Sequence, residues 1–193
     1  MSAPERPRLF VGVELPEDVR TAIHDATAPW RRSLPAFRWT SPDALHLTIA
    51  FIGHVDPDDV RAIDSAVEAA AATVASVPTG LTRFGAFPGR GAARVLWVGL
   101  ADLGSGLARV TTATTAALEP FLEADERPHH PHITIARAGR PADVPAAFYD
   151  DRVPAARWTI DAVTLFRSHL GAEAPRYERL GRWHLQAGRP EVP

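Results

Sequence analysis

Two short segments of this chain are nearly identical, and they constrain its fold more than any other feature of the sequence. They read HLTIA at residues 46–50 and HITIA at residues 132–136. Successive side chains of a β-strand point to opposite faces, so each segment presents Leu or Ile on one face and His, Thr and Ala on the other. Two such strands side by side, anchored by their apolar faces, predict a cleft in which two histidines and two threonines converge.

The remaining sequence alternates between strand and helix patterns. β-Branched and aromatic runs predict strands at 9–15, 37–40, 45–52, 81–87, 94–99, 132–136, 158–166 and 177–185. Capping residues, prolines in first turns and an alanine run predict helices at 16–29, 57–76 and 103–122. Several strands follow one another without an intervening helix. This order favours an α+β fold with antiparallel sheets and helices packed outside.

The composition excludes several classes of protein. The 193 residues include no cysteine, which rules out thiol catalysis, thiolate zinc sites and disulfide scaffolds. The net charge of −2 provides no overall attraction to nucleic acid, so any RNA contact should be local. No apolar stretch approaches the ~20 residues that span a bilayer, and the N-terminal sequence lacks the apolar core of a signal peptide. We expect a cytoplasmic monomer without membrane segments.

The chain resembles the 2H phosphoesterase superfamily, whose mark is a pair of H-x-T motifs in an internally duplicated, bilobed fold. Four segments follow the order found in its RNA 2′,3′-cyclic phosphodiesterase, or 2′-5′ RNA ligase, branch: RLFVGVELP, RWTSPDALHLTIAFIGHV, HPHITIAR and LFRSHLGAEAPRYERLGRWHL. The resemblance covers nearly the whole chain. It implies a single domain over residues 1–193 with two pseudo-symmetric lobes, whose antiparallel sheets line a central cleft. About residues 187–193 are expected to be a flexible tail.

The implied reaction is the opening of a 2′,3′-cyclic phosphate at the end of an RNA. A water must lose a proton as it attacks phosphorus, and the leaving ribose oxygen must gain one. Because histidine titrates near neutral pH, His46 and His132 are the predicted acid–base pair, and no cofactor is expected. Thr48 and Thr134 are predicted to donate hydrogen bonds to the non-bridging phosphate oxygens, where negative charge accumulates.

The resemblance implies further roles. Arg137 occupies the last position of the family's H-x-T-x-x-R pattern and would grip the phosphate. An unbroken strand would turn Arg137 away from His132, so this role requires a bulge or strand end near Ala136. By analogy, His132 activates the water and His46 protonates the 3′ oxygen, which yields a 2′-phosphate. Run backward, the same pair would act as a slow 2′-5′ RNA ligase.

Two other interpretations remain open. One is a zinc site built from histidines, although it gives the repeated threonines no role. Its candidate ligands are His46, His129, His130 and His132. The other is a non-catalytic RNA- or nucleotide-binding module that uses the same cleft and stacks bases on aromatic side chains. The candidates for stacking include Trp39, Phe51, Phe84 and Trp183.

Overall fold

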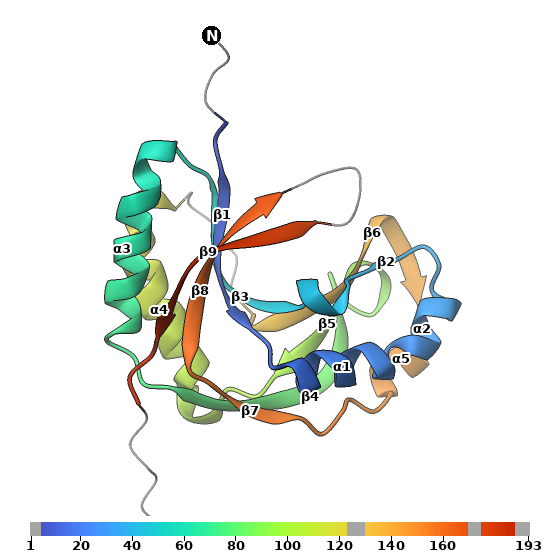
Figure 1. Ribbon diagram of the computed structural model, residues 1–193. Coiled ribbons are helices and arrows are strands. Elements are labelled where there is room, and N and C mark those ends of the chain that lie inside the picture. Colours follow the sequence, from blue (N-terminus) through green and yellow to red (C-terminus); the bar gives the residue numbers. More distant parts are fainter. Residues whose placement is uncertain (1–4, 123–129, 170–174, 188–193) are drawn as a thin grey trace, which may run out of the picture.

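The strand-forming runs of the sequence assemble into a curved sheet in this computed structural model, which describes residues 5–122, 130–169 and 175–187 (Figure 1). The strands are β1 (Arg8–Glu14), β2 (Arg38–Trp39), β3 (His46–His54), β4 (Val77–Phe87), β5 (Gly91–Leu100), β6 (His132–Val144), β7 (Arg157–Ile160), β8 (Ala162–His169) and β9 (Arg176–His184). The α-helices are α1 (Glu17–Ala26), α2 (Ala28–Ser33), α3 (Val60–Ala71), α4 (Gly106–Leu118) and α5 (Ala146–Asp150). Single turns of 3-10 helix are η1 (Pro42–Ala44), η2 (Pro57–Asp59), η3 (Leu103–Ser105) and η4 (Glu119–Phe121).

The two strands that carry the repeated motif meet at the centre of the sheet. The strand order is β7-β4-β5-β6-β3-β1-β8-β9, and β2 also pairs with β6. The pairings between these strands are antiparallel. β3 and β6 are joined through Leu47 and Ile133, both fully buried. The apolar faces of the two motifs therefore anchor the junction, as their alternation predicts.

Helices cover the outside of the sheet. α3 and α4 lie against each other and pack on β3, β8 and β9 (Figure 1). The predicted α+β class, with antiparallel strands and helices outside, is confirmed. The division into two pseudo-symmetric lobes within one domain stays a prediction, and nearly all of the predicted tail lies outside the described residues. None of the helices in the described segments is long and apolar enough to cross a membrane.

The strand β3 contains a β-bulge within its motif. Its register with β1 passes from Ala50 opposite Val11 to Thr48 opposite Gly12, which leaves Ile49 as an extra residue. A bulge shifts the alternation of side chains by one position. Ile49 and Ala50 are accordingly both buried.

The strand β6 contains the same bulge at the equivalent place. Its register with β5 passes from Ala136 opposite Leu96 to Thr134 opposite Trp97, so Ile135 is the extra residue. Ile135 and Ala136 are both buried, and the next residue, Arg137, is exposed. The two copies of the motif thus share their backbone irregularity as well as their sequence.

Several elements differ from their predicted limits. α3 ends at Ala71 rather than at residue 76, because the chain must turn before the buried Val77 that begins β4. Asp56 caps the turn η2 rather than an α-helix, with its side chain accepting a hydrogen bond from the Asp58 backbone at 3.0 Å. The predicted strand 158–166 is two strands separated at Asp161, and β6 runs well past Ala136. The short helix α5 was not predicted.

Substitution of Leu47 tests the junction between β3 and β6. Leu47→Ala deletes a fully buried side chain, so we expect the free energy of unfolding to fall by ~2–5 kcal/mol. Urea denaturation followed by circular dichroism measures this change. Leu103→Ala is the matched control, because Leu103 is 52% exposed and its loss should change stability by less than about 0.5 kcal/mol. Equal effects of the two substitutions would contradict the central position of Leu47.

Candidate active site

The register between β3 and β6 brings the two motifs together. Leu47 lies opposite Ile133 in an antiparallel pair. The same register sets His46 beside Thr134 and Thr48 beside His132, on the face of the sheet away from the Leu47 side chain. The histidines therefore occupy one diagonal of a four-residue arrangement and the threonines occupy the other.

Each histidine is oriented by the same local hydrogen bond. His46 Nδ1 lies 2.8 Å from the carbonyl oxygen of Ala44, and His132 Nδ1 lies 2.6 Å from that of His130. A carbonyl oxygen can only accept, so Nδ1 is the nitrogen that carries hydrogen in each neutral ring. In both rings Nε2 is then the nitrogen that can exchange a proton with a substrate.

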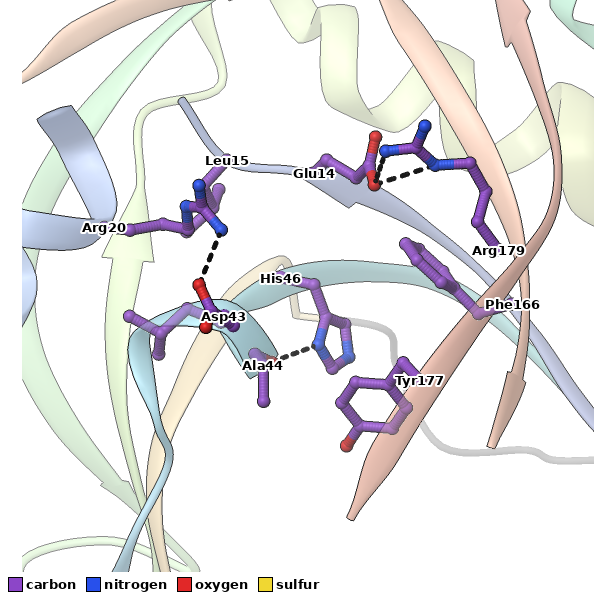
Figure 2. A pocket seen from close by; sticks show the side chains of 10 residues that line it. Glu14, Leu15, Arg20, Asp43, Ala44, His46, Phe166, Tyr177 and Arg179 are labelled. Atoms are coloured by element: carbon purple, nitrogen blue, oxygen red, sulfur yellow. Dashed lines mark hydrogen bonds and ion pairs between the residues drawn. The ribbon is translucent and has the colours of Figure 1, made fainter. Parts of the chain in front are cut away.

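Aromatic rings enclose His46. The ring centroids of Tyr177, Phe10 and Phe166 lie 4.8, 4.9 and 6.2 Å from the centroid of the imidazole, and Figure 2 shows Tyr177 and Phe166 beside it. Burial among these rings disfavours the charged form and is the main cause that lowers the pKa of His46 below its ordinary 6.5.

Polar neighbours modify this effect. The hydrogen bond to Ala44 acts in the opposite direction and raises the pKa of His46, whereas the positive charge of Arg137 and the proximity of His132 lower it further. The net result is a ring that favours its neutral state.

His132 has aromatic neighbours of its own from the other half of the sheet. Phe87 meets it edge-on with the ring centroids 5.0 Å apart, and Trp97 lies 6.3 Å away. Trp97 is opposite Thr134 in the pairing of β5 with β6. Both catalytic candidates therefore sit against aromatic walls contributed by strands other than their own.

Arg137 reaches the site because of the bulge at Ile135. Its Nη2 donates a hydrogen bond of 3.4 Å to Thr134 Oγ1. Burial is the main cause that raises the pKa of Tyr177, and the charges of Arg137 and Arg8 counteract it. Arg137 thus faces the same space as His46 and Tyr177, and the bulge required by its predicted position is present.

Two aromatic residues belong to the site, of which Phe51 is a stacking candidate from the sequence and Tyr177 is not. Tyr177 belongs to β9, far from either motif in the chain, and was not singled out. Phe51 follows the bulge of β3 as Arg137 follows that of β6, so it also returns to the face of the histidines. Its side chain is 54% exposed, and the Arg8 guanidinium carbon lies 5.8 Å from its ring centroid. Superposing the two motifs in the sequence sets Phe51 at the position of Arg137, which is a second reason to consider it.

The other interpretations of the sequence can be compared with this geometry. Within the described segments, no three His, Asp or Glu side chains are grouped so that they could hold a metal ion. His129, one of the four histidines of the zinc interpretation, lies outside those segments. Among the candidate stacking residues, Phe84 is buried at 1% exposure, and Trp39 and Trp183 pack against the core. Phe51 is the candidate that this geometry leaves accessible.

Comparison with known proteins identifies the family of this chain. Residues 15–172 match the 2'-5' RNA ligase superfamily. The chain belongs to this superfamily. A relative from Geobacillus stearothermophilus, named RNA 2′,3′-cyclic phosphodiesterase, is 28% identical over 183 residues, which are 94% of this chain and 58% of that protein. A relative of the same name from Bacillus subtilis is 28% identical over 186 residues, which are 93% of this chain and 97% of the relative.

Two crystal structures share the fold. The protein TT0787 of Thermus thermophilus has a TM-score of 0.80 and 27% identity, covering 94% of this chain and 100% of its own. Escherichia coli LigT complexed with 3′-AMP has a TM-score of 0.76 and 27% identity, covering 94% and 99%. The family predicted from the paired motifs is confirmed.

The titration of His46 tests the electrostatics of the site. We expect the pKa of its imidazole to lie below the ordinary 6.5, since burial and a nearby positive charge disfavour the cation. Arg137→Gln removes that charge and should raise the pKa of His46. NMR titration of the imidazole measures the pKa of His46 in the wild type and in Arg137→Gln. His46→Gln identifies the resonance. Arg61→Gln, on the outer helix α3, is the control. A wild-type pKa at or above 6.5 would contradict this account.

Proposed function

We propose that this protein hydrolyses the 2′,3′-cyclic phosphate end of an RNA to a 2′-phosphomonoester, with His46 and His132 as a general acid–base pair. The observation that carries this proposal is the convergence of two equivalent His–Thr faces, each with its imidazole held through Nδ1. The names of the two relatives agree with the activity. The residue roles below are part of the proposal.

The reaction needs two proton transfers on opposite sides of one phosphorus atom. Nε2 of His132 accepts a proton from the attacking water as the new P–O bond forms. The bond from phosphorus to the 3′ oxygen breaks, and His46 donates its proton to that oxygen. Each transfer contributes ~10²–10⁴-fold in rate. With a 5′-hydroxyl in place of water, the same steps form a 2′-5′ linkage, but water at ~55 M favours hydrolysis by mass action.

In this proposal the threonines and Arg137 bind the non-bridging oxygens. Thr134 accepts a hydrogen bond from Arg137, so its own hydroxyl hydrogen can point to a phosphate oxygen. Within the described residues, no side chain or backbone group hydrogen-bonds to the Thr48 hydroxyl, which is partly exposed. Such donors stabilise the charge that develops on phosphorus oxygens, because they are already oriented when the reaction begins.

The lowered pKa of His46 is relevant to its role as the acid. An acid must hold its proton before the reaction starts, and the free site favours the neutral ring. A cyclic phosphodiester is negatively charged, and an anion next to an imidazole raises its pKa. Binding of the substrate thus raises the pKa of His46, so that the ring can hold its proton near neutral pH.

The RNA substrate is supported by an exposed aromatic next to the histidines. Phe51 offers an accessible ring on the cleft face, and such rings stack nucleobases in proteins that bind single-stranded RNA. A related protein, LigT, has been crystallised with the nucleotide 3′-AMP. The proposal includes the predicted monomeric state and cytoplasmic location.

Product analysis tests the function. An RNA oligonucleotide with a 2′,3′-cyclic phosphate end is incubated with the protein in excess EDTA, and the product is identified by phosphorus NMR. We expect a 2′-monoester, because the 3′ oxygen leaves and no metal takes part. Binding without ring opening would favour the non-catalytic module. Loss of activity in EDTA, with recovery on adding zinc, would favour the zinc interpretation.

Substitution of either histidine tests the acid–base pair. We expect His46→Ala and His132→Ala each to lower kcat by ~10²-fold or more, because each removes one proton transfer. His169→Ala is the matched control, since His169 lies at the end of β8 and hydrogen-bonds Glu178 at 2.8 Å. Steady-state kinetics on the cyclic-phosphate RNA measure the effect. Near-normal turnover of either motif variant would refute the pair.

Conservative substitutions test the phosphate contacts. Thr48→Val and Thr134→Val keep the β-branched shape but remove the hydroxyl, so kcat/KM should fall by roughly ten- to a hundredfold. Arg137→Lys keeps the charge but loses the planar fork, and should be nearly as harmful. Thr112→Val, exposed on α4, is the control. If Arg137→Lys leaves kcat/KM unchanged while both threonine variants lower it, Arg137 does not hold the phosphate.

A further inference from the structure

A row of side chains leads away from His46 along β9. The register of β9 with β8 passes from Arg179 opposite Phe166 to Gly181 opposite Leu165, so Leu180 is an extra residue. This bulge places Arg182 and His184 on the same face as Tyr177 and Arg179. Both arginines contact Glu14 of β1, which is itself paired with His46, so the row belongs to the face of the active site.

Two adjoining cavities hollow this face. The first, of about 240 Å³, is lined by His46, Tyr177 and Phe166 among others (Figure 2). The second, of about 330 Å³, is lined by Trp158, Asp161 and Arg182 among others. Glu14, Leu15 and Arg179 line both. The two cavities therefore adjoin at these residues, and together they are called the β9 groove, which extends from His46 to Asp161.

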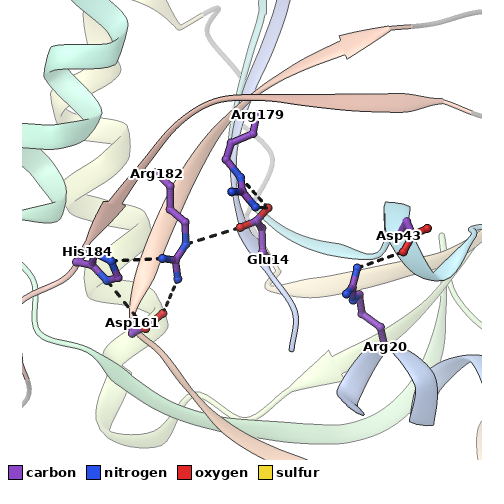
Figure 3. Close-up of polar contacts among 7 residues, drawn as sticks. All are labelled: Glu14, Arg20, Asp43, Asp161, Arg179, Arg182 and His184. Atoms are coloured by element: carbon purple, nitrogen blue, oxygen red, sulfur yellow. Dashed lines mark hydrogen bonds and ion pairs between the residues drawn. The ribbon is translucent and has the colours of Figure 1, made fainter. Parts of the chain in front are cut away.

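Carboxylates hold the two arginines of the groove in place (Figure 3). Arg179 donates to Glu14 Oε1 through Nε, at 3.1 Å, and through Nη2. Arg182 donates to Asp161 Oδ1 at 3.1 Å, and its Nε lies 3.7 Å from Glu14 Oε2. The arginine side chains remain 57% and 35% exposed. Exposed ion pairs are weak, so a phosphate can replace a carboxylate on an already oriented guanidinium.

We propose that the β9 groove binds the RNA strand that precedes the cyclic-phosphate nucleotide, with Arg179 and Arg182 contacting its backbone phosphates. This inference rests on the proposed function, which places the cyclic phosphate at His46. The preferred substrate is then an oligoribonucleotide, because a cyclic mononucleotide has no upstream phosphate to reach either arginine. A DNA strand is excluded as a substrate, since only ribose can form the 2′,3′-cyclic ester.

The test compares two substrates with the same terminal base: an RNA hexamer ending in a 2′,3′-cyclic phosphate, and the corresponding cyclic mononucleotide. The measured quantity is the ratio of kcat/KM for the hexamer to kcat/KM for the mononucleotide. We expect Arg179→Gln combined with Arg182→Gln to lower this ratio by roughly tenfold or more, since two charged contacts are lost. The slope of log kcat/KM against log salt for the hexamer should become shallower by about 0.7 per lost contact.

Two further variants make the result specific. Arg61→Gln removes an exposed arginine from α3, which covers the opposite face of the sheet, and should leave the ratio unchanged. Arg182→Lys keeps the charge, so it should retain most of the salt dependence of kcat/KM for the hexamer. It should lower the ratio less than the double variant does. An unchanged ratio in the double variant, or an equal loss on both substrates, overturns the inference. Failure of the wild-type protein to open the cyclic phosphate of the hexamer would instead refute the proposed function.

Discussion

The antiparallel contact between β3 and β6 is the interaction on which the rest of this structure depends. Leu47 and Ile133 are fully buried there, and the hydrophobic gain from burying their faces favours one register over its neighbours. A slip by one residue would expose the apolar face and bury both histidines. The same burial that holds the sheet together therefore places His46, Thr48, Thr134 and His132 on one surface.

Three of the bulges in this sheet shape the site. Those at Ile49 and Ile135 return Phe51 and Arg137 to the face of the histidines. The third, at Leu180, places Arg182 on the same face as Arg179, so that both arginines of β9 lie on the face of the histidines. β-Bulges are frequent next to active sites because they redirect side chains without breaking the strand. In this protein they extend the face of the two histidines from β6 across to β9.

The charges of the protein act locally. With a net charge of −2 the chain has no general affinity for RNA. Arg137 lies close enough to His46 to lower its pKa, and the arginines of the β9 groove are each held by a carboxylate. In the proposed function, recognition of an RNA end depends on these arginines, which are already oriented before the RNA binds.

The sequence by itself determined the α+β class and the faces of the two motif strands, because alternation is a local property of the chain. It thereby indicated His46, His132 and their threonines. The position of Arg137 needed the tertiary structure, since a bulge arises from register with a neighbouring strand rather than from local propensity. For the same reason the sequence could not place Tyr177 beside His46. Side-chain direction after a bulge is decided by hydrogen bonds to strands remote in sequence, and only the folded sheet contains them.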